Sequence, residues 1–144
     1  MAASKKCKVV IIDGQGGKIG RQLVAALCNS GKDMDLLAVG TNSIATENML
    51  KGGAYSAATG ENAVVVASRT ADIIAGPLGI VIADALHGEV TPAMAVAVGQ
   101  NDGKKVLIPI DRCDNVVAGA EGIPIGDLIQ KAVDIIIEEL NTFI

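Results

Sequence analysis

Short apolar runs alternate with amphipathic segments along the chain. The runs at Lys8–Ile12, Asp35–Val39 and Lys105–Ile110 are typical of strands that are buried on both faces of a sheet. Between the first two, Gly17–Asn29 repeats apolar residues at the spacing of a helix. A terminal helix is expected at Asp127–Leu140, with a polar stripe made of Asp127, Lys131, Asp134 and Glu138.

Capping residues and helix breakers mark two further helices. Ser43 is expected to cap a helix that ends at Gly52. Thr91 followed by Pro92 predicts a helix over Ala93–Val98, because proline suits the first helical position. That helix carries no charge, and a helix that is apolar on all sides is usually buried. We therefore expect it to lie at the interface of a homo-oligomer.

The middle of the chain is harder to assign from its pattern. Apolar runs at Ala63–Ala67 and Asp72–Ala75 predict two strands. A crossover is needed after them, and Leu78–Leu86 is expected to supply it as a helix. Asn115–Ala118 is interpreted as a last short strand.

This alternation of buried strands and helices predicts an α/β fold. We expect one Rossmann-like domain over residues 1–144, with a mainly parallel sheet and helices on both of its faces. In such sheets, ligands bind beyond the carboxyl ends of the strands, where the strand order changes direction. The residues that follow each predicted strand are therefore the candidates for a site.

A cluster of glycines follows the first strand. Gly14, Gly17 and Gly20 have the spacing G-x-x-G-x-x-G, which resembles that of extended short-chain dehydrogenases and related NAD(P)-binding folds. Gly14 is expected to take an unusual φ, and Gly16 or Gly17 to let the backbone approach a phosphate. Gly20 is expected to let the helix pack closely on the sheet. With the first-turn N–H groups facing an anion, the predicted cofactor-binding residues here are Asp13, Gly14, Gln15, Gly16, Gly17, Lys18 and Ile19.

Two alternatives compete with this interpretation of the turn. A Walker phosphate loop requires serine or threonine after its lysine, where this chain has Ile19, and a leading glycine, where it has Ile12. Hydrolysis of ATP at such a loop is therefore disfavoured. A tight turn without a ligand needs one or two glycines, so four glycines favour an anion site.

The loop after the second strand bears on the identity of the nucleotide. An acid at this place would bind the adenine ribose of NAD, but the sequence has Thr41, Asn42 and Ser43, while Asp33 and Asp35 precede the strand. These small polar residues resemble an NADP-binding pattern, although the usual arginine is missing. We predict NADP or NAD as the cofactor. A mononucleotide, another phosphate ester, or a plain helix cap stays open.

Other strand ends supply the remaining candidates. Gly76 and Pro77 form a turn that is expected to face the cofactor. Arg112 can bind a carboxylate or phosphate. Cys113, beside that arginine, can have a lowered pKa and act as a nucleophile, or can be a small buried hydrophobe.

The single histidine of the chain is His87. With Glu89 and Asp84 nearby in the sequence, it can act as a general acid or base, and it can also pair with Cys113. One histidine and three scattered cysteines do not predict a metal site. His87, Cys113 and Arg112 are thus the catalytic candidates, none of them specified by a motif.

Composition narrows the classes of partner. Half of the residues are hydrophobic, but Tyr55 and Phe143 are the only aromatic ones, so base-stacking surfaces are not expected. The net charge of −4 disfavours nucleic-acid binding, whereas a small phosphorylated ligand remains compatible with local backbone dipoles. Neither a signal-peptide core nor a run of membrane-spanning length is found. We expect a cytoplasmic protein without membrane or nucleic-acid partners.

Several motifs together resemble one known family. DGQGGKIG, GTNSIATENML, ATGENA, GPLGIV, GEVTPAMA and DRC look like those of small single-domain bacterial proteins catalogued as a domain of unknown function. The resemblance spans nearly the whole chain, implies a protein that stands alone, and transfers no activity or catalytic residue.

Three functional hypotheses follow. The first is an NAD(P)-binding minimal oxidoreductase or cofactor-responsive module. The second is a non-enzymatic oligomeric sensor or scaffold that binds a phosphometabolite. The third is a flavodoxin-like protein for flavin mononucleotide (FMN) or a phosphoester, which the scarcity of aromatic residues weakens, because the flavin ring is usually sandwiched by such side chains.

Overall fold

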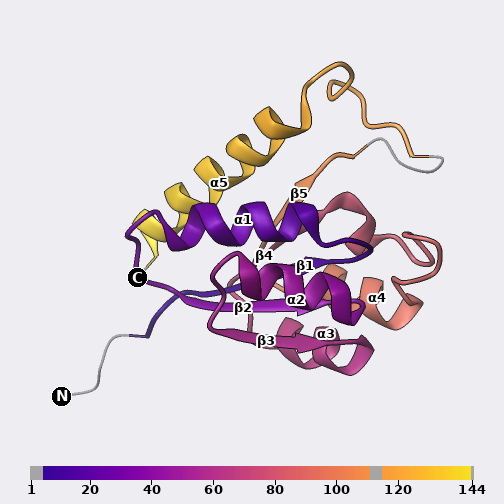
Figure 1. Ribbon diagram of the computed structural model, residues 1–144, viewed down its shortest axis with the longest axis horizontal. Helices are drawn as coiled ribbons and strands as arrows, with labels where there is room; N and C mark the ends of the chain where they lie inside the picture. Colours follow the sequence, from indigo (N-terminus) through magenta and orange to yellow (C-terminus); the bar gives the residue numbers. More distant parts are fainter. Residues whose placement is uncertain (1–4, 111–114, 144) are drawn as a thin grey trace.

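A five-stranded parallel sheet forms the centre of the described structure (Figure 1). The computed structural model describes residues 5–110 and 115–143. The strands lie in the order β3-β2-β1-β4-β5, and every neighbouring pair is parallel. Their bounds are β1 Lys8–Asp13, β2 Asp35–Gly40, β3 Ser56–Thr59, β4 Ile73–Pro77 and β5 Lys104–Ile108. The order changes direction between β1 and β4, as in the first half of a Rossmann sheet.

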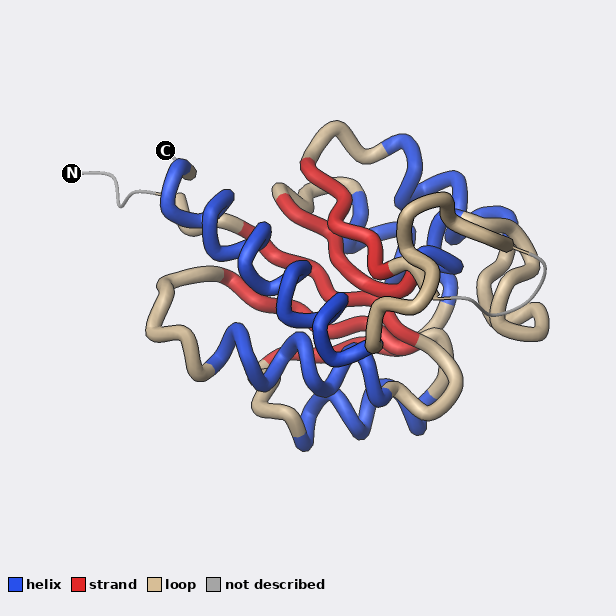
Figure 2. Tube along the Cα trace, turned by 90° about the horizontal axis from the view of Figure 1, so that it is seen from above, coloured by secondary structure: helices blue, strands red, loops and turns tan. Residues whose placement is uncertain are grey.

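Helices cover both faces of this sheet (Figure 2). They are α1 Lys18–Cys28, α2 Ser43–Lys51, α3 Glu61–Ser68, α4 Pro92–Gln100 and α5 Ile125–Thr142, with a short 3₁₀ turn η1 at Leu78–Val81. The α/β fold with a parallel sheet and helices on both faces is therefore confirmed. No helix among the described residues has the length and apolar character required to cross a membrane.

The alternation of side chains along β1 explains why both faces must be covered. Val9 and Ile11 pack in a cluster with residues of α1 and α5, whereas Val10 and Ile12 pack with residues of α3 and α4. All four side chains are at most 1% exposed. A strand that is apolar on both sides is stable only between two layers of helices.

The run Ala63–Ala67 was predicted as a strand, and that prediction is wrong. It lies in α3, where Val64 and Ala67 are buried while Val66 is 47% exposed. This spacing is helical. Its β-branched residues resemble a strand in sequence, but the crossover from β3 to β4 has to pass over the sheet, and a helix does so with its backbone groups satisfied.

Two further assignments of the middle and end of the chain are wrong, and one strand was missed. The predicted helix Leu78–Leu86 is reduced to η1 followed by turns, and Asn115–Ala118 is not a strand. The missed strand is β3, whose small residues Ser56–Thr59 pair with β2 at the edge of the sheet. Its sequence, SAAT, lacks the bulky residues that mark a strand.

The caps of two helices test the predicted starts. Thr91 caps α4 by accepting a hydrogen bond from the Met94 N–H, at 3.2 Å, as predicted. The cap of α2 is Asn42, which accepts from the Ala45 N–H at 2.8 Å, so the assignment of Ser43 is wrong by one residue. Asparagine and serine are equally good caps, so their sequence alone did not distinguish them.

Candidate functional site

The turn between β1 and α1 is organised by a buried carboxylate. Asp13 is 4% exposed, and its two oxygens accept from the N–H of Gly14 at 2.8 Å and from the N–H of Gly20 at 2.7 Å. The carboxylate thus links the end of the strand to the first turn of the helix. Asp13, which was predicted to contact a cofactor, lines the cavity described below and also accepts from two of the donors of the turn.

Glycine is required in this turn at particular places. Gly17 has a left-handed φ of 71°, and a Cβ atom there would lie 2.6 Å from the Ala45 Cα of α2. Gly14, which was predicted to have an unusual φ, does not have a positive one; the left-handed neighbour is Gln15, with φ 48°. Gly14 is required for space instead, because its Cβ would lie 2.5 Å from the Thr41 Oγ1.

The other two glycines differ in their surroundings. A Cβ atom on Gly20 would lie 2.6 Å from the Met49 Sδ and 2.8 Å from the Asp13 Cβ, so α1 packs closely against its neighbours here, as predicted. A Cβ atom on Gly16 would meet nothing within 4 Å. Gly16 is thus the position of the turn that faces open space.

The first turn of α1 offers hydrogen-bond donors. Among the described residues, no partner accepts from the N–H groups of Gly16, Lys18 and Ile19, while Gly17 donates to the Gly14 carbonyl at 2.9 Å. Helix N-termini attract anions because such donors and the helix dipole point the same way. The exposed side chain of Lys18 adds a positive charge.

A cavity of about 340 Å³ lies beside these donors, which we call the β1–β4 cavity. One side is the turn from Asp13 to Ile19; the other is formed by Pro77, Leu78, Gly79, Ile82, Ala85, Leu86, Ile110 and Asn115. It sits where the strand order changes direction, the usual ligand position of such sheets. Polar donors on one wall and aliphatic side chains on the other suit a ligand with an anionic end and an apolar body.

The strand end at Gly76 and Pro77 supplies part of that second wall. Pro77 lines the cavity, but Gly76 does not. Gly76 is packed against β1, where a Cβ atom would collide with the Ile12 carbonyl oxygen. The close spacing of β1 and β4 therefore explains why this position is a glycine.

The predicted ribose-binding residues do not line this cavity. Thr41 and Asn42 lie on the other side of the glycine turn and donate to the Glu89 Oε1, at 2.8 Å from the Thr41 Oγ1 and 2.7 Å from the Asn42 Nδ2. The Gln15 N–H donates to the same oxygen at 2.9 Å. Ser43 begins α2 and is exposed. At the end of β2, Thr41 and Asn42 therefore contact a carboxylate of the chain itself.

The charge of Glu89 is stabilised in this position. Burial by itself raises the pKa of its carboxyl, but the hydrogen bonds from Gln15, Asn42 and Thr41 outweigh burial, and the pKa lies below its ordinary value. Glu89 is therefore ionised at neutral pH.

Of the three catalytic candidates, His87 is the one that lies among the described residues. His87 is exposed, with a left-handed φ of 57°. Arg112 and Cys113 lie outside the described residues. Within the described residues, no group of three or more histidine, cysteine or acidic side chains is placed to hold a metal ion. Burial raises the pKa of the Cys7 thiol to about 11, with Asp72 and Glu139 adding to the effect, so this cysteine is a poor nucleophile.

Sequence reasoning missed the residues contributed from beyond β4. Leu78, Ile82 and Leu86 form the apolar wall, and Glu89 meets the turn from a segment more than 70 residues away in the chain. Glu89 was noted as a neighbour of His87 but not as a partner of Thr41. The motif GPLG pointed to the right strand end, but nothing local to it showed which side chains fold back over β1.

Comparisons with known proteins agree with this fold. A family model described as a domain of unknown function (DUF3842) matches residues 8–141, which confirms the resemblance seen in the motifs. No curated protein matches the sequence. One solved structure with the same fold is a dodecameric FMN-dependent UbiX-like decarboxylase from Escherichia coli O157:H7. It is 16% identical, with a TM-score of 0.50, over 93% of this chain and 94% of that one.

Proposed function

The chain belongs to that family of unknown function, and we propose that it binds a phosphorylated ligand of mononucleotide size, with FMN as the leading candidate. The observation that carries the proposal is the β1–β4 cavity, in which N–H groups of α1 that have no partner among the described residues lie beside an aliphatic wall. Its volume, about 340 Å³, lies at the small end of ligand pockets and favours a mononucleotide over a dinucleotide. The FMN-dependent enzyme of the same fold supports this choice.

The residues present fit the parts of FMN. The phosphate would lie at the start of α1, near the N–H groups of Lys18 and Ile19 and the Lys18 ammonium group. The flavin ring would lie against aliphatic side chains, Leu78, Ile82 and Leu86, in place of the aromatic residues that usually enclose it. When bound, FMN supplies hydride and electron transfer, and the chain orients it and excludes water from one side of the ring.

NADP fits less well. Its 2′-phosphate would lie at the end of β2, where Thr41 and Asn42 already donate to the Glu89 carboxylate. The small volume of the β1–β4 cavity disfavours NAD as well as NADP. The phosphometabolite hypothesis uses the same donors as FMN but leaves the aliphatic wall without a function. This wall therefore favours a ligand with a large apolar part.

A charge placed at Gly16 tests the proposal. A side chain there has open space, so Gly16→Asp adds a negative charge beside the phosphate without a clash. Gly126→Asp is the matched control, since Gly126 also has nothing within 4 Å and lies in the first turn of α5. Flavin fluorescence titration is expected to show FMN binding by the wild type and Gly126→Asp, weakened about tenfold or more in Gly16→Asp.

A panel of ligands distinguishes the flavin proposal from the phosphometabolite hypothesis. FMN, riboflavin, NADP, a sugar phosphate and inorganic phosphate are compared by thermal shift. Stabilisation by FMN above riboflavin supports a phosphate-plus-ring site. If FMN gives no shift while a sugar phosphate does, the phosphometabolite hypothesis replaces the flavin proposal, and no shift with any ligand rejects both.

We also propose that the chain forms a homo-oligomer through α4. Within the chain, Met94, Ala95 and Val98 of this helix are buried, but Val96 remains 53% exposed on its outer face. Val66 of the adjacent α3 is also exposed. The structure with the same fold is dodecameric, which supports assembly. Light scattering is expected to give a mass above that of the monomer, reduced in Val96→Glu; a monomeric wild type rejects the proposal.

A further inference from the structure

The strand order raises a question about dinucleotides. The order β3-β2-β1-β4-β5 is that of a sheet on which a dinucleotide lies across the crevice, with its adenine ribose over the end of β2. Here the β1–β4 cavity covers one side of the crevice only. On the β2 side, the Glu89 carboxylate accepts hydrogen bonds from the loop that follows β2.

Glu89 reaches this side from the segment that follows β4 and η1. That segment folds back on itself, with the Asp84 N–H donating to the Val90 carbonyl at 2.7 Å and the Val90 N–H donating to the Ala85 carbonyl at 3.1 Å. Val90 is buried against the core between the sheet and α4. The backbone next to Glu89 is thus anchored, and its side chain extends over the carboxyl edge of β1.

One carboxylate oxygen joins two loops. The Glu89 Oε1 accepts from the Gln15 N–H of the β1–α1 turn and from Thr41 and Asn42 of the β2–α2 loop, all within 2.9 Å. The Asn42 amide is fully used, because its Nδ2 also donates to the Gln15 carbonyl and its Oδ1 caps α2. A 2′-phosphate at this place would need donors of this kind.

We propose that Glu89 is a specificity-determining residue, whose carboxylate occupies the place of a ribose 2′-phosphate at the end of β2 and so excludes NADP. The inference rests on the proposed binding of a phosphorylated ligand in the β1–β4 cavity. A 2′-phosphate at this place must displace the carboxylate from three hydrogen bonds and also meets its negative charge. A mononucleotide in the β1–β4 cavity does neither.

Removal of the side chain tests this role. Glu89→Ala is expected to raise the affinity for NADP at least about tenfold, because the Gln15, Thr41 and Asn42 donors become available to the 2′-phosphate and a repulsive charge is lost. The affinity for FMN stays within about twofold of the wild type. Asp84→Ala is the control, since it removes an exposed acid from the same segment. It should leave NADP affinity unchanged.

Hydrogen exchange of the Gln15 amide measures its hydrogen bond to Glu89 without any ligand. The Gln15 amide is expected to lose protection in Glu89→Ala and to keep it in Asp84→Ala. Should Glu89→Ala fail to fold, Glu89→Gln serves instead: it retains the shape and loses the charge, and is expected to give a smaller gain for NADP.

The outcomes separate this inference from the proposed function. If FMN binds the wild type and neither Glu89 variant gains NADP affinity, the inference is wrong and the proposed function stands. If FMN does not bind but Glu89→Ala gains NADP binding, the flavin proposal fails and the role of Glu89 is upheld. Unchanged protection of the Gln15 amide in Glu89→Ala overturns the hydrogen bond on which the inference rests.

Discussion

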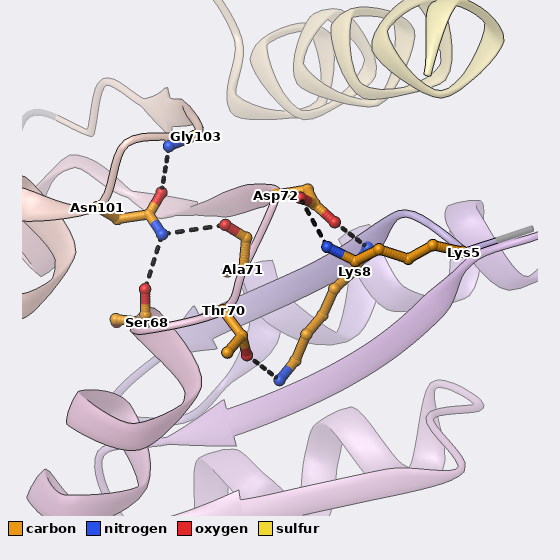
Figure 3. Close-up of polar contacts among 8 residues, drawn as sticks. All are labelled: Lys5, Lys8, Ser68, Thr70, Ala71, Asp72, Asn101 and Gly103. Carbon is orange, nitrogen blue, oxygen red and sulfur yellow. Dashed lines mark hydrogen bonds and ion pairs between the residues drawn. The ribbon is translucent and has the colours of Figure 1, made fainter. Parts of the chain in front are cut away.

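Two asparagines at opposite edges of the sheet hold loops together in the same way. At the amino edge, the Asn101 Nδ2 donates to the carbonyls of Ser68 and Ala71, and its Oδ1 accepts from the Gly103 N–H (Figure 3). At the carboxyl edge, the Asn42 amide is equally saturated, by Gln15, Glu89 and Ala45. A dense polar network is therefore not by itself a sign of a ligand site.

The surroundings of the two networks make the difference. At the amino edge, the Asp72 carboxylate accepts from the Lys8 N–H at 2.9 Å, and the Lys8 ammonium group donates to Thr70 (Figure 3). The donors shown there have partners within the chain. At the carboxyl edge, the N–H groups of Lys18 and Ile19 have none among the described residues and face a cavity. Donors that have no partner in the described part of the chain, beside an apolar wall, distinguish the candidate site from a purely structural polar network.

The largest loss of stability is expected at Gly17, where the carboxyl edge has no room for a side chain. Gly17→Val should destabilise the fold by about 3 kcal/mol or more, because it combines a left-handed φ with a collision against the Ala45 backbone. Urea unfolding followed by circular dichroism measures this loss. Gly16→Ala is the control and should change stability by less than about 0.5 kcal/mol. Equal tolerance of both variants would contradict the described turn.

A smaller loss of stability is expected at the amino edge. Asn101→Ala removes three hydrogen bonds to backbone groups and should cost about 2 kcal/mol in urea unfolding. The affinity for FMN should not change, because the network lies at the far edge of the sheet. Asn62→Ala, on the exposed side of α3, provides the control for stability. A large change in FMN affinity with Asn101→Ala would break the division between the two edges.

The positive charge of Lys18 beside the cavity should affect FMN binding but not stability. Lys18→Ala is expected to weaken FMN binding about threefold to tenfold at low salt, and the effect should shrink as salt is raised. Stability and the affinity for riboflavin, which has no phosphate, should stay the same. Lys131→Ala, on the exposed stripe of α5, is the control. A loss of riboflavin affinity equal to that of FMN would place Lys18 beside the ring instead.

The smallest effect on stability is expected when the pH is lowered. Because the folded pKa of Glu89 lies below its ordinary value of 4.5, its hydrogen bonds contribute stability that is fully present above that value and is lost as pH falls through the lower folded pKa. The stability of the wild type relative to Glu89→Gln should therefore fall between about pH 6 and about pH 3. Urea unfolding midpoints of the wild type and Glu89→Gln at both pH values measure this difference in stability. A constant difference would show that Glu89 is not paired as described.

The sequence by itself determined the parts of this protein that depend on near neighbours. The buried run Lys8–Ile12, the cap and proline at Thr91 and Pro92, and the polar stripe of α5 all appear in the structure as expected. Each rests on periodicity or on a hydrogen bond within one helical turn. The same local chemistry identified the glycine turn after β1, though not which of its residues would take a left-handed φ.

Tertiary structure alone decided the rest. The run Ala63–Ala67 became a helix because of where the chain had to go next, and Ser56–Thr59 became a strand because β2 offered an unpaired edge. Glu89 meets Gln15 across 74 positions of sequence, a pairing that no local pattern encodes. Whether a polar group at the end of a strand is left for a ligand or used by the chain depends on such distant contacts.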